Sequence, residues 1–263
     1  MHSKKRKDVF LLVFLVLLLI AINYSFLDKQ IENFFEEYET GVVERVIDGD
    51  TVVVNKTSVR LLGINSPEKG EIYYTEAKEF LEELVLEKEV KLKFGKEKKD
   101  RYNRELRYLF VEEENINKKL VEKGLANFYF PERNDFFYYI EFRKAWKECL
   151  EKGESLCEKS LDICAECIEL QEFNYKDQEV ALQNICGFSC DLKDWTIKDE
   201  GRKKFVFPEF LLDSGGIVII NVGEGVDSRD ILYWKGEDYV WTESGDSLFL
   251  RDAQGKLVLW RSY

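Results

Sequence analysis

The stretch VIDGDTVVVNKTSVRLLGINSPE, residues 46–68, decides the fold of the first half of the chain. Its two runs of β-branched and aliphatic residues, 52–54 and 59–64, predict buried strands that form a hairpin. Seven polar residues interrupt or end these runs: Asp48, Asp50, Thr51, Arg60, Asn65, Ser66 and Glu68. Carboxylates and an arginine at strand ends favour a functional site over a solvated face. The same groups could hold a divalent cation against a phosphodiester.

The residues around this hairpin extend the pattern. Further strands are predicted at 42–47, 90–94 and 106–111, and helices at 76–88, 117–124 and 135–152. Thr75 is the predicted N-cap of the first helix and Asn117 that of the second. Five strands with interleaved helices predict an α+β domain over residues 41–160, a five-stranded OB-like barrel that carries three helices.

The pattern changes after residue 163. Short apolar runs are separated by turn signals and show no helical periodicity; they lie at 179–186, 195–198, 205–207, 216–222, 230–234, 247–251 and 257–263. The last two runs flank a predicted hairpin loop at 252–255. This spacing predicts an all-β sandwich at 168–263, joined to the first domain by a cysteine-containing linker at 161–167.

The amino terminus carries an export signal. A basic cluster at 4–7 precedes an apolar segment at 9–27, which is about long enough to span a bilayer. We expect residues 1–27 to form a cytoplasmic basic tip and an uncleaved transmembrane helix, followed by an acidic spacer at 28–40 and by two extracellular domains. A cleaved signal peptide, which would make the protein secreted, is the main alternative. A buried core helix is a weaker one, because the segment has no polar face.

Six cysteines cluster near the domain boundary: Cys149, Cys157, Cys164, Cys167, Cys186 and Cys190. An even number of cysteines in an exported chain predicts disulfides. The alternative is a zinc site made of the four thiolates at 164, 167, 186 and 190, whose spacing is compatible with one. The sequence does not assign the disulfide pairing.

The net charge of −12 is unevenly distributed. Residues 1–162 hold 28 Lys and Arg against 32 Asp and Glu, whereas residues 163–263 hold 11 against 19. The first part nevertheless contains a basic strip: Lys91, Lys93, Lys96, Lys98, Lys99, Arg101, Arg104 and Arg107. Local field matters more than net charge for capturing a polyanion, so the strip predicts a nucleic-acid-binding surface. Within it, Lys99, Arg101 and the adjacent Tyr102 are expected to contact the substrate, whereas the acidic second part is not expected to grip DNA on its own.

His2 is the only histidine of the chain. Hydrolases with a catalytic histidine, His-ligated zinc enzymes and His-based nucleases are thereby excluded. Any hydrolytic base must be a carboxylate, a lysine, a tyrosine or a metal-bound hydroxide, and Glu68 is the leading candidate. Arg60 and Arg104 could each bind phosphate oxygens through two N–H groups, a geometry that lysine cannot reproduce.

The expected metal ligands are hard oxygen donors. Asp50 would supply a carboxylate, Asn65 an amide oxygen and Thr51 a backbone carbonyl. Together with water, this set suits one Ca²⁺ ion, which accepts irregular oxygen cages.

Four sequence blocks resemble the staphylococcal nuclease (thermonuclease) family in order and spacing. They are DGDT at 48–51, RLLGINSPE at 60–68, DRYNR at 100–104 and GLA at 124–126. The resemblance covers residues 41–160 and implies a five-stranded OB-fold with three helices that hydrolyses DNA and RNA with Ca²⁺ and water. It further implies that Asp50 binds calcium, that Arg60 and Arg104 stabilise the transition state, and that Glu68 acts on water.

Two positions depart from the family pattern. Asn65 stands where the best-known members have an aspartate, so the site loses one negative charge and calcium should bind more weakly. Millimolar calcium outside the cell would still fill such a site. Asn103 replaces a glycine common before the second arginine, and asparagine tolerates positive φ better than other non-glycine residues. We interpret both substitutions as tuning of the site.

Residues 168–263 resemble the lamin tail domain, an immunoglobulin-like β-sandwich. The matching blocks are residues 179–184, 190–199, 205–208 with 212–216, and 244–250 with Gly255. Trp195 is expected in the core. The resemblance implies a non-catalytic interaction or targeting module, with a ligand that it does not name.

These features together predict a membrane-anchored, outward-facing and monomeric nuclease that cuts DNA and RNA. The alternative is a cell-surface nucleic-acid-binding or adhesion protein whose OB-fold is catalytically inactive. Under that alternative the acids and arginines would be surface pairs worth about 0–1 kcal/mol each. Nothing would then keep all four catalytic candidates, at positions 50, 60, 68 and 104, in one chain.

Overall fold

A computed structural model describes residues 14–15, 18–20, 23, 38–130 and 136–263. Residues 40–263 form one compact unit, and both predicted domains belong to it. The predicted anchor at 9–27 lies mostly outside the described residues, as does most of the spacer at 28–40. Within the described part of the chain, no helix combines the length and the apolar character needed to cross a membrane.

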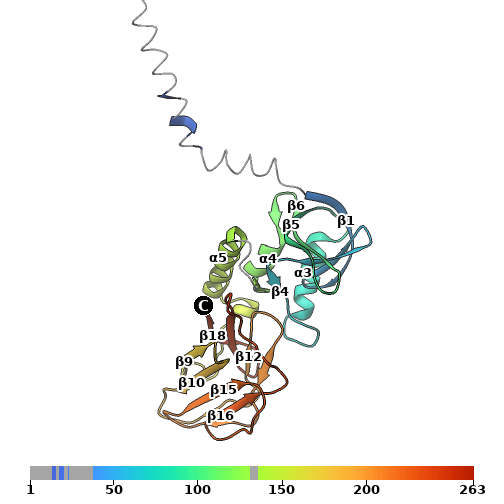
Figure 1. Ribbon diagram of the computed structural model, residues 1–263. Helices are drawn as coiled ribbons and strands as arrows, with labels where there is room; N and C mark the ends of the chain where they lie inside the picture. The colour runs from blue at the N-terminus through green and yellow to red at the C-terminus, as the bar shows by residue number, and fades with distance from the viewer. Residues whose placement is uncertain (1–13, 16–17, 21–22, 24–37, 131–135) are drawn as a thin grey trace, which may run out of the picture. The chain divides into compact units, whose positions relative to one another are not determined.

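The hairpin predicted from residues 46–68 forms part of a closed barrel (Figure 1). Strands β1 (Tyr38–Asp48), β2 (Thr51–Val54) and β3 (Thr57–Leu61) pair antiparallel in sequence order. Strands β5 (Glu89–Lys99) and β6 (Glu105–Val111) continue the sheet beyond β1. The parallel pairing of β3 with β6 closes the five-stranded barrel, which confirms the OB-like prediction. The two-residue strand β7 (Glu114–Asn115) extends the sheet beyond β6. Strands β4 (Ile64–Asn65) and β8 (Asn127–Phe128) pair with each other in a separate two-stranded sheet.

Three helices accompany the barrel, as predicted: α3 (Tyr74–Val85), α4 (Ile116–Glu122) and α5 (Phe136–Lys152). Both predicted N-caps are wrong. Helix α3 follows Tyr73, which has a φ of 65° and no side-chain cap. Helix α4 is capped by Asn115, whose side chain accepts a hydrogen bond from the backbone N–H of Lys118.

Asn117, the predicted cap of α4, instead lies in the core. Its Oδ1 accepts from the backbone N–H of Leu109 at 3.0 Å, and its Nδ2 donates to the carbonyl of Leu62 at 2.8 Å. The side chain therefore ties α4 to the barrel wall, a contact between distant segments that local sequence does not reveal. A short 3-10 turn, η1 (Ser155–Cys157), follows α5.

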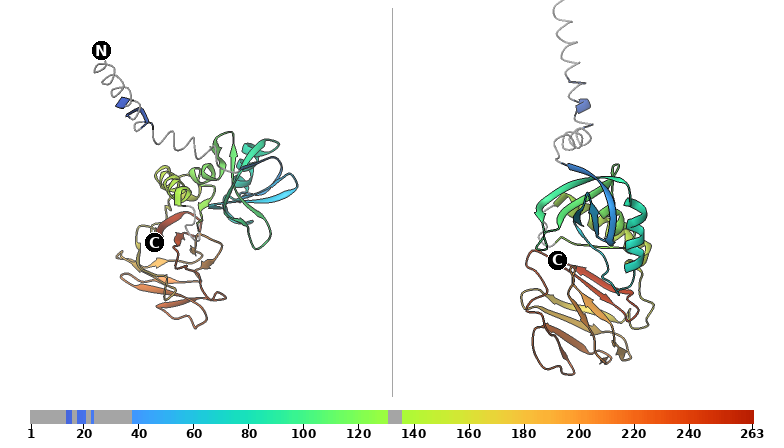
Figure 2. Two further views of the ribbon diagram at one scale, coloured as in Figure 1. Left: turned by 45° about the horizontal axis from the view of Figure 1, so that its top comes forward. Right: turned by 90° about the vertical axis from the view of Figure 1, so that its right-hand side faces the viewer.

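The C-terminal half is the predicted all-β sandwich (Figures 1 and 2). One sheet holds four strands in the order β16 (Ile231–Trp234), β15 (Ile217–Val222), β10 (Glu179–Asn184) and β9 (Ile168–Asn174). The other holds β13 (Lys204–Val206), β12 (Thr196–Lys198), β17 (Ser247–Arg251) and β18 (Leu257–Ser262). A small ladder pairs β11 (Cys190–Asp191) with β14 (Leu211–Leu212). Trp195 is buried in the core between the sheets, as expected.

Strand β9 is not among the strands predicted from the sequence. Its pairing with β10 contains a register shift at Leu170 and Glu172, where a bulge interrupts the two-residue alternation of apolar side chains. The hairpin loop expected at 252–255 does join β17 to β18, which pair antiparallel.

Barrel and sandwich pack directly against each other. Phe249 and Leu257 of the sandwich belong to the same apolar cluster as the barrel core. The ring of Trp146, on α5, lies 5.5 Å from that of Phe249, and the ring of Phe128 lies 6.0 Å from that of Trp260. Because large aromatic side chains contribute much of the free energy of a buried contact, residues 40–263 are held together as one packed body.

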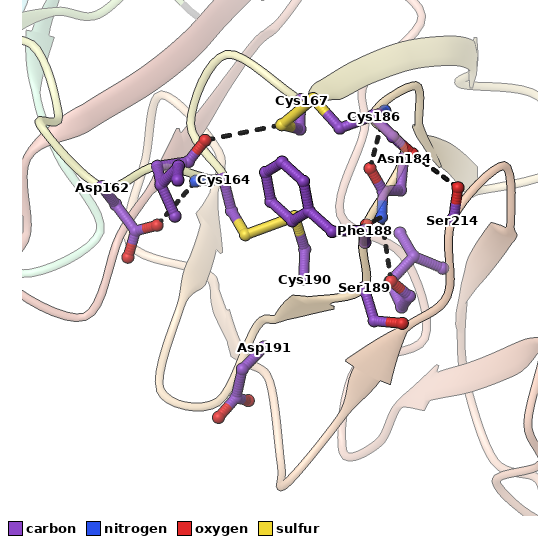
Figure 3. Close-up of a disulfide and its surroundings, with 12 residues drawn as sticks. Asp162, Cys164, Cys167, Asn184, Cys186, Phe188, Ser189, Cys190, Asp191 and Ser214 are labelled. Carbon is purple, nitrogen blue, oxygen red and sulfur yellow. Dashed lines mark hydrogen bonds between the residues drawn. A yellow bond between two sulfur atoms is a disulfide. The ribbon is translucent and has the colours of Figure 1, made fainter.

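All six cysteines form disulfides, in the pairs Cys149–Cys157, Cys164–Cys190 and Cys167–Cys186. The disulfide prediction is confirmed. The zinc alternative is not supported, because each thiol sulfur is bonded to another sulfur. Figure 3 shows the second and third bridges beside each other, where residues 164 and 167 of the predicted linker are tied to the sandwich.

Candidate active site

Arg60 lies at the centre of the polar cluster. It sits on β3 opposite Thr51 of β2, and its side chain is almost completely buried. Its Nη2 is 3.0 Å from Asp50 Oδ2 and donates to Asn65 Oδ1 at 3.0 Å, while Nη1 donates to the carbonyl of Leu61 at 2.7 Å. A guanidinium held at three points has a fixed orientation, which is what bidentate binding of phosphate needs.

The carboxylate of Asp50 is also held in place by hydrogen bonds. Its Oδ2 accepts from the backbone N–H of Ser66 at 2.8 Å and from the Ser66 hydroxyl at 3.1 Å, and its Oδ1 accepts from Thr51 Oγ1 at 3.1 Å. Burial, followed by the negative charge of Asp50, raises the pKa of the neighbouring Asp48 above its ordinary value. A cation bound next to these two partly buried carboxylates would offset their mutual repulsion.

Arg104 approaches the cluster from the basic strip. Its Nε donates to Asp100 Oδ2 at 2.7 Å, and its Nη1 donates to Thr51 Oγ1 at 3.5 Å. Asn103, immediately before it, has a φ of 63°, as its replacement of a glycine predicts. The positive φ lets the chain turn so that both the backbone N–H and the side chain of Arg104 reach Asp100.

Glu68 lies at the end of the segment that begins with Asn65. Its backbone N–H donates to Glu71 Oε2 at 3.0 Å. Its carboxylate pairs with Arg202 of the sandwich, Oε1 to Nε, at 2.8 Å, and 45% of its side chain is exposed. The carboxylate is therefore accessible to water, unlike Asp50 and Arg60.

The predicted substrate residues stand beside Arg104. The guanidinium of Arg101 lies 4.8 Å from the centre of the Tyr102 ring, and that of Arg104 lies 5.5 Å from it. Lys99 donates to Asn103 Oδ1 at 3.3 Å. The Tyr102 ring is exposed, and both guanidinium groups lie over it as cation–π partners.

The chain resembles known nucleases over the part that forms this cluster. Residues 58–159 match the family described as staphylococcal nuclease homologue. The thermonuclease of Staphylococcus intermedius is 34% identical over 131 residues, which are 46% of this chain and 77% of the relative. The chain belongs to the staphylococcal nuclease family. The thermonuclease of Staphylococcus hyicus is similar to the same extent, with 34% identity over 122 residues, 42% of this chain and 70% of that protein.

The rest of this staphylococcal nuclease homologue matches a second family. Residues 165–263 match the Lamin Tail Domain model, so the sandwich is a lamin tail domain. An uncharacterized endonuclease of Haemophilus influenzae is 36% identical over 107 residues, 39% of this chain and 59% of that protein. The nuclease family and a nucleic-acid substrate, both inferred from the sequence, are thus confirmed at this level.

Sequence reasoning missed the contacts that the lamin tail domain makes with the nuclease cluster. The carbonyl of Gly201 accepts from Asn65 Nδ2 at 2.5 Å. Lys198 and Lys204 pair with Glu71 at 2.9 and 3.2 Å. Burial by itself raises the pKa of Glu71, but Lys198, the Glu68 N–H and Lys204 together lower it to about 2. The weak sequence signal was the local excess of cations at 198–204 in an otherwise acidic domain.

A group of buried carboxylates in the lamin tail domain comprises Asp199 and Glu200, in the loop between β12 and β13, and Asp246, just before β17. Glu200 Oε1 accepts from the backbone N–H of Phe130, and its Oε2 accepts from Ser247 Oγ at 3.2 Å. Burial, followed by the charge of Asp246, raises the pKa of Asp199 to about 7 and that of Glu200 to about 8. Burial raises the pKa of Asp246 to about 6. These acids carry less negative charge at neutral pH than the sequence implies.

The nuclease cluster is compatible with a hard cation, although no group of three or more Cys, His, Asp or Glu side chains arranged to hold a metal is found among the described residues. Its donors are of mixed type: the carboxylates of Asp48 and Asp50, the amide of Asn65 and the oxygens of Thr51. Calcium accepts such mixtures of carboxylate, amide and backbone oxygens. Each oxygen has two lone pairs, so the bonds to Arg60 do not exhaust their capacity. Asp48 is the donor that the predicted ligand set lacks.

Proposed function

We propose that this nuclease hydrolyses phosphodiester bonds of DNA and RNA in a Ca²⁺-dependent reaction with water. The observation that carries the proposal is the continuous chain of contacts from Arg104 through Thr51 and Asp50 to Arg60. It brings two arginines and the candidate metal carboxylate into one cluster from segments about 50 residues apart in sequence. Surface pairs without a function have no reason to converge in this way.

Each side chain has a role that follows from its surroundings. Arg60, buried and held at three points, presents its guanidinium to the oxygens of the reacting phosphate. Arg104 does the same from the open side of the cluster. Glu68, the exposed carboxylate, orients a water molecule and takes its proton as the water oxygen attacks phosphorus; the P–O bond to the leaving sugar oxygen then breaks, and that oxygen takes up a proton.

Asp50, Asn65 and Thr51, together with Asp48, would hold one Ca²⁺ ion. When bound, the ion supplies positive charge that offsets the charge developing on the pentacoordinate phosphate. Replacement of a family aspartate by Asn65 reduces the negative charge of the ligand set, so we expect weak binding, with a Kd of about 10⁻⁴ to 10⁻³ M.

We further propose that both domains face the outside of the cell, where calcium at this concentration is present. Three disulfides support an oxidising compartment, because such bonds rarely persist in the cytosol. The basic cluster at 4–7 before the apolar segment at 9–27 supports an anchored amino terminus with the positive charges inside. The lamin tail domain serves interaction or targeting in this proposal, and the protein acts as a monomer.

The proposal is tested by incubating the full-length protein, in detergent, with single-stranded DNA or with RNA in EGTA or in about 10 mM Ca²⁺, which exceeds the upper end of the expected Kd range about tenfold. Cleavage that requires Ca²⁺ is the expected result. Binding of the oligonucleotide without cleavage under any of these conditions would instead favour the inactive cell-surface binding protein.

A further inference from the structure

One hairpin of the lamin tail domain contacts the segment 65–71 of the nuclease domain, and it is formed by β12, β13 and the loop 199–203 between them. Gly201 of the loop bonds to Asn65, and Lys198 and Lys204, which face each other where the loop joins the two strands, pair with Glu71. The hairpin thus follows the segment 65–71 from one end to the other. Arg202, at the tip, is the residue whose side chain reaches the candidate base Glu68.

Charge makes this hairpin unlike the rest of its domain. Residues 198–204 contain Lys198, Arg202, Lys203 and Lys204 against two acids, Asp199 and Glu200. Both acids are buried, and burial shifts them toward the neutral form, as their raised pKa values of about 7 and 8 show. The domain as a whole carries more acidic than basic residues, yet it turns a positive edge toward the site.

Arg202 is the cation of this edge that is most available to a ligand. Nearly half of its side chain, 46%, is exposed, and the single ion pair to Glu68 is made by Nε. In the described part of the chain, Nη1 and Nη2 have no hydrogen-bond partner. Lys198 is by contrast largely buried against Glu71, and Lys203 lies over the ring of Tyr239.

Two roles for Arg202 require interactions of different strength. In the first role, Arg202 would inhibit catalysis by holding Glu68 in the ion pair, as a lock, until that pair opened. An ion pair between two half-exposed side chains shifts an equilibrium by at most about fivefold, which is too little for a lock. A phosphate group offers two oxygens to a guanidinium in a charge-assisted, bidentate geometry, so a phosphate of bound nucleic acid would compete with Glu68 for Arg202. Such an exchange would also leave the Glu68 carboxylate available to water.

We propose that Arg202 forms a phosphate-binding subsite, contributed by the lamin tail domain, for a phosphate next to the one that is cut. This inference rests on the proposed nuclease function. The substrate strand would lie between the basic strip of the barrel, which includes Arg104, and the hairpin edge at Arg202. The lamin tail domain, acidic overall, then takes part in substrate binding through this one edge.

The subsite is tested first by binding, which does not depend on cleavage. The full-length protein is titrated with a fluorescent single-stranded DNA oligonucleotide in EGTA at several salt concentrations. Arg202→Ala should weaken binding about three- to tenfold and reduce the slope of log K against log salt by about 0.7, the value for one lost contact with single-stranded phosphate. Arg202→Lys should retain the salt slope.

The matched control is Arg229→Ala, which removes the same charge from the same domain. Arg229 is exposed, pairs with Asp213 and lies outside the hairpin. Its removal should change neither affinity nor salt slope. If Arg202→Ala behaves like Arg229→Ala, the subsite is refuted.

Kinetics provide the second test. With Ca²⁺ present, Arg202→Ala should raise KM for an oligonucleotide by the same factor as Kd, with a much smaller change in kcat. An increase in kcat on removal of Arg202 would show that the residue restrains Glu68, which contradicts the subsite. Because the binding titration is independent of catalysis, absence of cleavage in the wild type would count against the proposed function alone.

Discussion

The side chain of Asn65 connects the two domains of this nuclease. Its Nδ2 donates to the carbonyl of Gly201 at 2.5 Å, while its Oδ1 accepts from Arg60 Nη2 at 3.0 Å. Only a residue with both a donor and an acceptor can satisfy these two neighbours. An aspartate, which the family pattern has here, would place a carboxylate oxygen against a carbonyl oxygen. The substitution therefore fits the docked lamin tail domain, in addition to lowering the charge of the metal site.

Asn65→Asp should accordingly destabilise the protein in the absence of calcium. Because a buried acceptor would lose its donor, we expect the free energy of unfolding to fall by about 1–3 kcal/mol in EGTA. Thermal or urea unfolding measures this. Asn103→Asp, which adds the same charge at an exposed turn, is the control and should have little effect. Equal stability of Asn65→Asp and wild type would show that the Gly201 contact contributes nothing.

Glu71 should give the protein an acid-sensitive contact between the domains. Its pKa is lowered to about 2 in the folded protein from an ordinary value of 4.5. A lowered pKa stabilises the folded state fully above pH 4.5, and this stabilisation is lost as the pH falls toward 2.

Glu71→Gln should therefore cost on the order of 2 kcal/mol at pH 6 and progressively less below pH 4. Urea denaturation at several pH values tests this, with the exposed Glu83→Gln as control. A cost that stays constant down to pH 3 would mean that the ion pairs with Lys198 and Lys204 are not its source.

The buried acids Asp199, Glu200 and Asp246 should make the free energy of unfolding depend on pH in the direction opposite to that for Glu71. The pKa values of Asp199, Glu200 and Asp246 are raised to about 7, 8 and 6. Folded protein then keeps protons that the unfolded chain has lost, so the free energy of unfolding falls as pH rises from about 4 to about 8, and it changes no further above that range.

Glu200→Gln should flatten this decline and stabilise the protein at pH 8 by on the order of 2 kcal/mol, because it removes a charge that burial disfavours. Its effect at pH 4.5 should be small. Glu243→Gln, at an exposed position of the same domain, is the control. A wild-type stability that rises between pH 5 and 8 would contradict the burial of these carboxylates.

The three disulfides should leave no thiol for alkylation in the native protein. Iodoacetamide should add no mass before reduction and six carbamidomethyl groups after reduction and unfolding, one for each cysteine. Removing the Cys164–Cys190 bridge as a double alanine variant should cost about 3 kcal/mol, given the 26-residue separation. Alkylation before reduction at any of Cys164, Cys167, Cys186 and Cys190, or bound zinc, would refute this pairing.

Local signals predicted the larger part of the fold. The hairpin at 46–68, the turn at Asn103 and the strands of the sandwich depend on neighbouring residues, so alternation and turn chemistry identify them. Strand β9 was missed because a bulge breaks its alternation. The cap of α4 was misplaced because Asn117 is used for a tertiary contact, and no local rule distinguishes that use from capping. Helix α3 begins after Tyr73, which has a positive φ and no side-chain cap that a sequence rule could identify.

The geometry of the candidate site was predictable where its residues are close in sequence, and not where it depends on contacts between the domains. Arg60, Asp50 and Thr51 lie on two adjacent strands, so the sequence brings them together. The bond from Asn65 to Gly201 joins residues 136 positions apart, and its existence depends on how two domains dock. The sequence separates into two family patterns, and neither pattern contains the contact between them.

In the proposed mechanism of this nuclease, Glu68 activates the attacking water. The most direct measurement is the initial rate of single-stranded DNA cleavage in Ca²⁺ by Glu68→Gln and by wild type, with circular dichroism to verify that both are folded. Loss of a general base at an otherwise intact site should lower kcat by about 10²- to 10⁴-fold. A rate within twofold of the wild type would show that Glu68 is not the general base.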